Sequence, residues 1–136
     1  SVISPEKIVE AVTKARMNQF IESLPANYQT NVADAEEFMQ PVHHHKLALA
    51  RAFLINSPIL LIDDPTRDLD IASEKEVIEI LYELMKDKTV VMVSSRLSLL
   101  TQMDQVFVAD GGVVLDVKDY GGLDRYQGYL STHELI

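Results

Sequence analysis

The chain contains 136 residues, of which 47% are hydrophobic and 24% charged, and its net charge is -9. This size and composition suit one modest globular domain, and the acidic balance argues against a nucleic-acid partner or a general anionic-membrane surface. The lack of cysteine excludes disulfide scaffolds and thiolate metal sites. No apolar run approaches the roughly 20 residues of a membrane helix. Because the chain starts at Ser1, without an initiator Met or a signal-peptide pattern, we expect a piece of a longer protein.

The first 57 residues predict helices. Ser4, Pro5 and Glu6 supply an N-cap, a proline at the first helical position and an acid in the first turn. Apolar residues at helical spacing then predict one broad core face, made by Ile8, Val9, Val12, Ala15, Met17, Phe20 and Ile21. After an acidic loop, a second helix is expected from Pro41 to about Ile55. It is apolar nearly all round, which predicts burial.

Residues 58–116 alternate between strands and helices, a pattern typical of a parallel α/β fold. Two short apolar runs, 59–62 and 89–93, predict buried strands. Between them, Ser73 and Glu76 predict a capping box before a helix that ends near Lys88. A short helix is expected over 96–101. Gly111-Gly112 predicts the turn of a hairpin between 106–109 and 113–115.

The most informative run extends from Ile59 to Asp70, where four apolar residues end in Asp63 and Asp64 and Pro65 follows at once. This places two carboxylates at the carboxyl end of a strand, where open α/β sheets have their ligand sites. The acids repel each other unless a cation or a proton intervenes. Magnesium with nucleotide phosphate is the solution of P-loop enzymes. By itself, the run fits an ordinary acidic turn equally well.

The order of these segments resembles the second half of an ATP-binding cassette, the motor domain of ABC transporters, and most closely the exporter type. The resembling segments are the helical subdomain at 5–32, the helix after the family signature at 46–54, the Walker-B strand and D-loop at 59–70, the histidine-loop region at 90–99, and the closing pattern at 132–136. The resemblance implies an α/β fold, a partial P-loop NTPase (RecA-like) parallel sheet preceded by an ABC-type helical subdomain. The implied parts are 1–57 as helical subdomain and signature helix, 58–116 as partial core with Walker B, and 117–136 as C-terminal extension.

The same resemblance implies ATP and Mg²⁺ as ligands, with the metal held through water by Asp63. It implies a location on the cytoplasmic side of a membrane, beside the transmembrane domain of a transporter, and a homo- or hetero-dimer of nucleotide-binding domains. No Gly-x-x-x-x-Gly-Lys segment occurs in the chain, so the phosphate-cradling loop of the family is missing from it. We therefore expect that another chain or the missing N-terminal half completes the sheet, or that the fragment dimerises or swaps strands.

The signature position departs from the family. Where relatives read Leu-Ser-Gly-Gly-Gln, this chain has Met39-Gln40-Pro41-Val42-His43. In the family, this helix start presents a serine and backbone amides to the γ-phosphate held by the opposing subunit. Pro41 has no amide hydrogen, and Val42 adds bulk where glycine allows close approach. We expect much weaker phosphate contact from this face.

Two catalytic positions also depart. Asp64 stands where the family has its general-base glutamate, and the missing methylene withdraws the carboxylate by about 1.5 Å, against a tolerance of about 0.5 Å. Ser95 stands at the switch-histidine position and cannot carry a positive charge. In the D-loop, Asp70 matches the family, whereas Arg67 and Asp68 replace small residues.

Several features keep more than one interpretation. His43-His44-His45 suggests a metal site, but consecutive helical residues point about 100° apart, so a polar helix face is the simpler interpretation. Protonated His43 or His44 is a hypothetical source of anion attraction at this helix start. Arg51 fits a structural ion pair with a strand-end acid or an exposed snorkelling side chain. The stretch 117–131 is interpreted as an insertion relative to the family. Its tyrosines could anchor a partner, or the stretch could be a partly ordered loop; they are Tyr120, Tyr126 and Tyr129.

Three functions follow. The first is part of the ATPase motor of a membrane transporter, in which Asp63 holds magnesium, Asp64 orients the attacking water and 39–43 face the partner's nucleotide. The second is a non-hydrolysing pseudo-cassette that serves as a structural or interaction module. The third, which the residues support least, is a metal-binding protein built on the histidine triplet. Because phosphoryl transfer depends on positioning, the departures favour a unit that hydrolyses ATP weakly or not at all.

Overall fold

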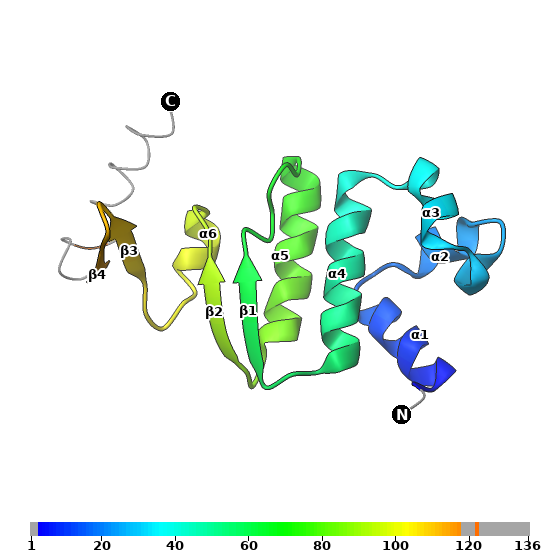
Figure 1. Ribbon diagram of the computed structural model, residues 1–136, viewed down its shortest axis with the longest axis horizontal. Coiled ribbons are helices and arrows are strands. Elements are labelled where there is room, and N and C mark those ends of the chain that lie inside the picture. The colour runs from blue at the N-terminus through cyan, green and yellow to red at the C-terminus, as the bar shows by residue number, and fades with distance from the viewer. Residues whose placement is uncertain (1–2, 118–121, 123–136) are drawn as a thin grey trace. The chain divides into compact units, whose positions relative to one another are not determined.

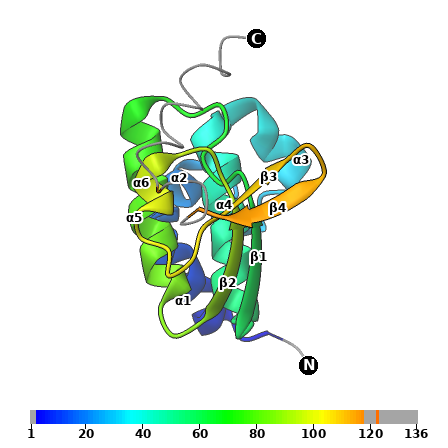
Figure 2. The same ribbon diagram turned by 90° about the vertical axis from the view of Figure 1, so that its left-hand side faces the viewer.

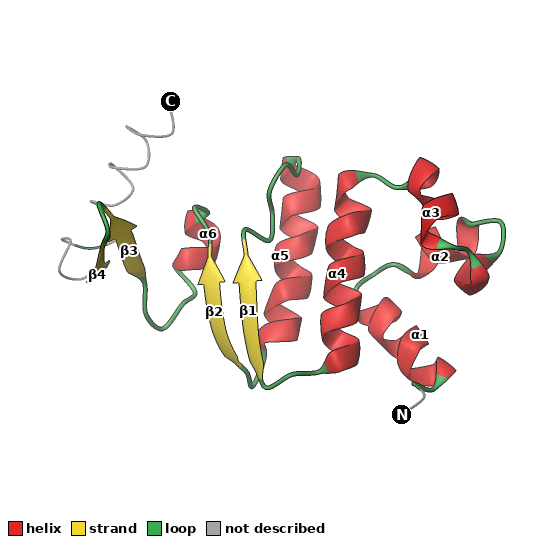
Figure 3. Cartoon of the chain, viewed as in Figure 1, coloured by secondary structure: helices red, strands yellow, loops and turns green. Residues whose placement is uncertain are grey.

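The computed structural model describes residues 3–117 and 122, which form two compact units, Ser1–Met92 and Val93–Ile136. Each unit is described by itself. Figure 1 and Figure 3 show the helices and strands. The elements in chain order are α1 (Pro5–Lys14), α2 (Asn18–Ser23), η1 (Asn27–Gln29), α3 (Val32–Ala35), η2 (Glu36–Phe38), α4 (Pro41–Ile55), β1 (Ile59–Asp63), α5 (Ile71–Met85), β2 (Thr89–Val93), α6 (Leu97–Leu100), β3 (Phe107–Asp110) and β4 (Val113–Asp116).

The first helix begins as predicted but is shorter. The Ser4 side chain accepts from the Lys7 N–H and caps α1. The single helix expected through residue 21 is wrong, because Arg16 adopts a left-handed φ of 55° and separates α1 from α2. The chain therefore turns, and the core forms around Val12, Ala15 and Met17. The N-terminal part of the predicted core face, Ile8 and Val9, is exposed.

Helix α4 has the predicted bounds but not the predicted burial. It packs against α1 on one side and α5 on the other. Only Lys46, Leu49 and Ala50 are buried in it, whereas Ile55 is exposed. The sequence is apolar nearly all round, but the described residues cover only the part of the helix that faces its two neighbours. Arg51 is exposed and forms no ion pair with the described residues.

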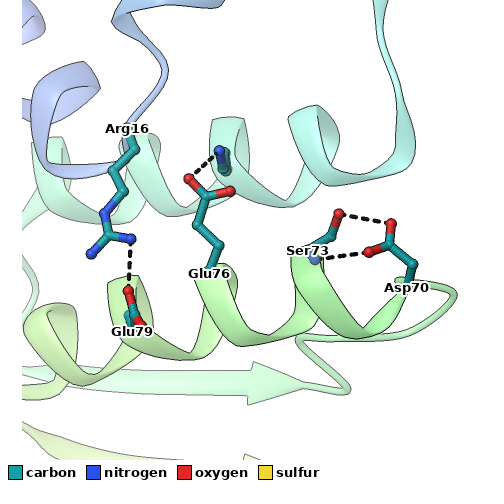
Figure 4. A network of polar contacts seen from close by, with 6 residues as sticks. Arg16, Asp70, Ser73, Glu76 and Glu79 are labelled. Carbon is teal, nitrogen blue, oxygen red and sulfur yellow. Dashed lines mark hydrogen bonds and ion pairs between the residues drawn. The ribbon is translucent and has the colours of Figure 1, made fainter.

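Two ion pairs tie the first half of the unit to α5, as Figure 4 shows. Lys46 Nζ of α4 lies 2.7 Å from Glu76 Oε1, and the Lys46 side chain is only 9% exposed. Arg16 Nη1, in the turn between α1 and α2, lies 2.8 Å from Glu79 Oε2. Both acids stand on the same helix, so α5 receives cations from two separate segments.

Helix α5 begins at Ile71, and its N-cap lies three residues before the predicted cap, Ser73. Asp70 is the N-cap, and its carboxylate accepts from the Ser73 N–H at 2.9 Å and from the Ser73 hydroxyl at 2.9 Å. The predicted capping box of Ser73 and Glu76 is therefore wrong, and Glu76 binds Lys46 instead. The core face of α5 is made by four almost fully buried side chains: Val77, Ile80, Leu81 and Leu84.

Strands β1 and β2 pair as a two-stranded parallel sheet, with both arrows pointing the same way in Figure 1 and Figure 2. The prediction that both strands are buried is wrong. Leu60 is buried, but Leu61, on the opposite face, is 81% exposed. Ile59, Val91 and Val93 are also exposed. The apolar runs have the composition of an internal parallel strand, but one of their faces is uncovered by the described residues.

The second unit contains α6 and an antiparallel hairpin. In β3 and β4, Phe107 pairs with Asp116 and Asp110 with Val113. Gly111 and Gly112 have φ values of 54° and 80°, which confirms the predicted tight turn. Leu99, Leu100 and Val108 are buried. The tyrosines of the predicted insertion and the closing pattern at 132–136 lie outside the described residues.

Candidate functional site

An open cleft of about 430 Å³ lies where the carboxyl end of β1 meets the first turn of α4. It brings together three positions of the predicted site, Asp63 and Asp64 from the strand end and Pro41 from the signature segment. The loop between β1 and α5 forms another part of its wall. The full lining consists of Pro41, His44, His45, Asp63, Asp64, Arg67 and Asp68.

The two acids differ in their surroundings. Asp63 is the last residue of β1, is exposed, and no described residue forms a hydrogen bond or ion pair with it. Asp64 is half-buried and adopts a left-handed φ of 43°, which is uncommon for a residue other than glycine. The chain thus leaves the strand between the two carboxylates, and Pro65 continues the turn.

Asp64 is bound by Arg67, a partner that we did not predict. Arg67 Nε donates to Asp64 Oδ2 at 2.8 Å, and the Arg67 N–H donates to the Asp64 carbonyl at 3.3 Å. Asp64 raises the pKa of the Arg67 guanidinium above its ordinary value, first by this hydrogen bond and then by its charge; Asp63 and Asp68 contribute less. The sequence signal was present as an acid and an arginine three residues apart.

His45 of α4 holds the same loop from the other side. Its Nε2 lies 3.0 Å from the Arg67 carbonyl oxygen. Because a carbonyl can only accept, Nε2 carries the hydrogen and donates it. Helix α4 and the turn that follows β1 are therefore directly connected.

His43 is a structural residue of the helix start. Its Nδ1 accepts from the Gln40 N–H at 3.0 Å, and its ring stacks on Phe20 at a centroid distance of 4.0 Å. Burial lowers the pKa of His43 below its ordinary value, and the positive charges of Lys46 and His44 lower it further. An accepting Nδ1 and a lowered pKa both favour the neutral ring, which argues against His43 as the anion-attracting cation. For His44, the same hypothesis stays a prediction.

The histidine triplet does not converge on one point. His44 Nε2 lies 3.4 Å from Glu36 Oε1, whereas His43 and His45 contact Gln40 and Arg67. Among residues 3–117 and 122, no group of three His, Cys, Asp or Glu side chains has the arrangement of a metal site. The three rings thus serve three separate contacts.

The remaining predicted site residues have defined places. Met39 and Gln40 are extended, and Pro41 opens α4 without an N–H to offer an anion. Val42 is half-buried in the first turn. Asp70 caps α5 with both carboxylate oxygens engaged by Ser73. Ser95 follows β2 and belongs to the second unit, which is described separately from the cleft.

The acid pair fits magnesium only in part. Mg²⁺ keeps several waters and is usually bound by one or two carboxylates together with substrate phosphates. Asp63 meets this requirement, because its exposed carboxylate has no competing partner among the described residues. Asp64 is less available, because its Oδ2 already accepts a hydrogen bond from the positively charged Arg67 guanidinium.

Comparison with known proteins gives a consistent result. YgaD of Bacillus subtilis, provisionally named a multidrug export ATP-binding/permease protein, is 33% identical over 122 residues, 90% of this chain and 21% of YgaD. An ATP-dependent lipid A-core flippase of Pseudoalteromonas atlantica is 32% identical over 134 residues, 98% of this chain and 23% of the flippase. No family model matches the chain.

The fold matches as well. The solved structure of a bacterial Atm1-family ABC exporter with ATP bound superposes with a TM-score of 0.74 at 24% identity, over 98% of this chain and 24% of the exporter. The chain thus spans about a fifth to a quarter of the relatives that it matches. In the part of the chain that the structure describes, no helix is long and apolar enough to cross a bilayer. By sequence and by fold, the chain belongs with the ABC exporters, as part of an exporter-like nucleotide-binding domain.

Proposed function

We propose that the chain is part of the ATP-binding domain of an ABC exporter and that it contributes little or no ATP hydrolysis. The observation that supports this most is the state of the acid pair. Asp63, at the end of β1, has no hydrogen bond or ion pair with the residues that the structure describes, whereas Asp64, at the position of the family's general base, is bound to Arg67. The chain keeps a residue for holding magnesium, and the residue for activating water is already engaged.

Each residue of the proposed site has a role. Asp63 would hold Mg²⁺ through water beside the nucleotide phosphates, and residues 39–43 would face the nucleotide of a second domain. Bound Mg²⁺ would neutralise phosphate charge. Asp64 would need to orient a water, but its carboxylate is short and half-buried against Arg67. Asp70 would stand in the D-loop as the cap of α5, and Ser95 would replace the switch histidine without its charge.

The rest of the assembly is proposed from the same relationship. Residues 1–57 would form the helical subdomain with the signature helix, 58–116 the partial core and 117–136 an extension. A second nucleotide-binding domain or the N-terminal half of this one would complete the site and the sheet. A transmembrane domain would hold the unit at the cytoplasmic side of a membrane, where nucleotide binding drives transport.

A second candidate is a pseudo-cassette that serves as an interaction module. The pairing of Asp64 with Arg67 favours it, because it engages the carboxylate that stands at the position of the family's general base. The two candidates differ in nucleotide binding. The first requires that the assembled domain binds MgATP, whereas the second keeps the docking surfaces alone.

A chimera tests the proposal. The matching segment of YgaD would be replaced by this chain, so that the host supplies the rest of the protein, and MgATP binding would be measured by calorimetry. We expect the chimera to bind ATP in a magnesium-dependent manner. Asp63→Asn should remove that magnesium dependence, whereas Asp34→Asn, an exposed acid in α3, should leave it unchanged.

The outcomes separate the candidates. A folded chimera that binds no ATP would contradict the first proposal and support the interaction module. If the Asp63→Asn chimera still binds ATP with the same magnesium dependence, Asp63 is not the residue that holds the metal. Circular dichroism and gel filtration of the chimera confirm that loss of binding is not loss of folding.

A further inference from the structure

We propose that Arg67 is a tethered counter-ion of the acid pair, which occupies Asp64 and thereby restricts divalent cations to Asp63. This inference rests on the proposed function, since it assumes that the pair lies in a magnesium site. It adds a role for Arg67, which stands in the D-loop segment at a position where the family has a small residue. Arg67 would act as a positioning residue, through Asp64, and would not itself contact the reacting atoms.

The geometry of the contact supports this role. Arg67 Nε lies 2.8 Å from Asp64 Oδ2, a charge-assisted hydrogen bond at the short end of the usual range. The Arg67 N–H also donates to the Asp64 carbonyl, so the two residues are joined at both side chain and backbone. A metal ion that binds Asp64 Oδ2 directly competes with the guanidinium for that oxygen.

The loop that carries Arg67 is anchored on both sides. His45 Nε2 donates to the Arg67 carbonyl at 3.0 Å, which fixes the loop to α4. Pro65 and Thr66, the two residues between Asp64 and Arg67 in the sequence, are both buried. Only the outer part of the Arg67 side chain is free to move, because its backbone is held. The cation thus remains close to Asp64 even when the ion pair opens.

The charges that face the cleft make this cation important. Asp63, Asp64 and Asp68 line the cleft, and Arg67 is the only arginine or lysine in its described lining. Three carboxylates this close would repel one another without a counter-ion. A divalent ion and the Arg67 guanidinium can both supply that positive charge, and they compete for Asp64.

The test measures Mn²⁺ binding to the full 136-residue chain by electron paramagnetic resonance, since Mn²⁺ substitutes for Mg²⁺ at oxygen sites. Arg67→Ala should tighten Mn²⁺ binding about three- to tenfold, because it removes a nearby positive charge and releases Asp64. Arg51→Ala is the matched control. It removes the same charge from an exposed position on α4 and should change the affinity less than about twofold.

Further variants show whether the gain depends on Asp64. The double variant Arg67→Ala with Asp64→Asn should lose the gain, whereas Asp64→Asn alone should have a smaller effect, because Asp64 is occupied in the unmodified chain. Asp63→Asn should weaken Mn²⁺ binding in every background, and this arm tests the metal assignment of the proposed function separately. Near-ultraviolet circular dichroism verifies the fold of each variant.

Two results would overturn the inference. One is an equal change of Mn²⁺ affinity in Arg67→Ala and Arg51→Ala, which would mean that the loss of one positive charge from the chain explains the effect. The other is a gain that persists when Asp64 is also replaced, which would show that Arg67 does not act through that carboxylate. If either result occurs while Asp63→Asn still weakens binding, the counter-ion role fails and the proposed metal position survives.

Discussion

Helix α5 and the β1–β2 sheet are neighbours in the chain and have similarly apolar sequences, but only the helix has an almost fully buried apolar face. Val77 and Leu81 of α5 are 0% exposed, whereas Leu61 of β1 is 81% and Val93 of β2 is 64% exposed. Helix α5 packs against α4 and forms two ion pairs, one with Lys46 of α4 and one with Arg16. The sheet has only two strands among the described residues.

This difference shows which part of the chain stabilises itself and which part depends on added structure. The core of α5 is complete, so its contribution to stability comes from within the chain. The exposed strand faces have the composition of internal strands but contribute little until something covers them. The acid pair stands at the end of β1, on the sheet side of this comparison, and beside the start of α4.

The largest expected effect comes from truncating the packed side. Leu81→Ala should lower the free energy of unfolding by about 2–5 kcal/mol, because it leaves a cavity in a core that excludes water. Leu61→Ala removes the same atoms from an 81% exposed position and should cost less than about 0.5 kcal/mol. Urea denaturation of both variants measures the contrast. Equal losses would show that the sheet face is covered in solution.

A smaller effect is expected from the ion pair between α4 and α5. Lys46→Ala should cost about 1–3 kcal/mol, less than a fully buried pair, because the Glu76 side chain keeps contact with water. The double variant Lys46→Met with Glu76→Leu should recover most of this loss, since it replaces the pair by apolar groups. Lys75→Ala, an exposed neighbour, serves as the control. Stability unchanged in Lys46→Ala would contradict the role of the pair.

His43 gives a pH-dependent effect at the start of α4. Its pKa is lowered from 6.5 in the folded chain by burial, then by Lys46 and His44. The unfolded chain therefore binds the proton more readily, and the stabilisation present above pH 6.5 is lost as the pH falls through the folded pKa. His43→Gln keeps an acceptor for the Gln40 N–H but cannot titrate.

Thermal unfolding at pH 7.5 and 5.5 measures this effect. The melting temperature of the unmodified chain should fall relative to that of His43→Gln as the solution becomes more acidic. A relative gain at pH 5.5 would mean that the protonated ring is favoured in the fold. That result would restore the anion-attracting role rejected above.

The smallest effect is expected at the exposed cap of α5. Hydrogen bonds from the Ser73 backbone and then its hydroxyl lower the pKa of Asp70 below 3.8. This stabilisation is present above pH 3.8 and is lost as the pH falls through the folded value. Asp70→Asn keeps the cap without the titration. Between pH 5 and 3, the melting temperature of the unmodified chain should fall more steeply than that of the variant, and parallel curves would argue against the carboxylate's role.

Much of the local structure could be predicted because its signals are local. Ser4 and Pro5 mark the start of α1, Gly111 and Gly112 the hairpin, and the bounds of α4 follow from its composition. The break at Arg16 could not be predicted, because a left-handed φ in a residue other than glycine depends on tertiary contacts.

The place of the acid pair at a strand end could be predicted, but the contacts around it could not. Asp63 and Asp64 end a strand as expected, and Pro41 shares their cleft. The contact of His45 with Arg67 joins residues 22 positions apart, and that of Lys46 with Glu76 joins residues 30 apart. Such pairs follow from how α4 packs on α5, which periodicity alone does not determine. The Asp64 and Arg67 pair lay within reach of sequence analysis as an i, i+3 contact.

The most direct test of the central claim is the rate of ATP hydrolysis by the YgaD chimera, measured beside a repaired version. The repaired version carries Asp64→Glu, Arg67→Ser and Ser95→His. We predict that the chimera hydrolyses ATP at least about 100-fold more slowly than the repaired version, because a positioned general base contributes about 10²- to 10⁴-fold. Equal and rapid turnover by both would contradict the account and show that Asp64 activates water despite Arg67.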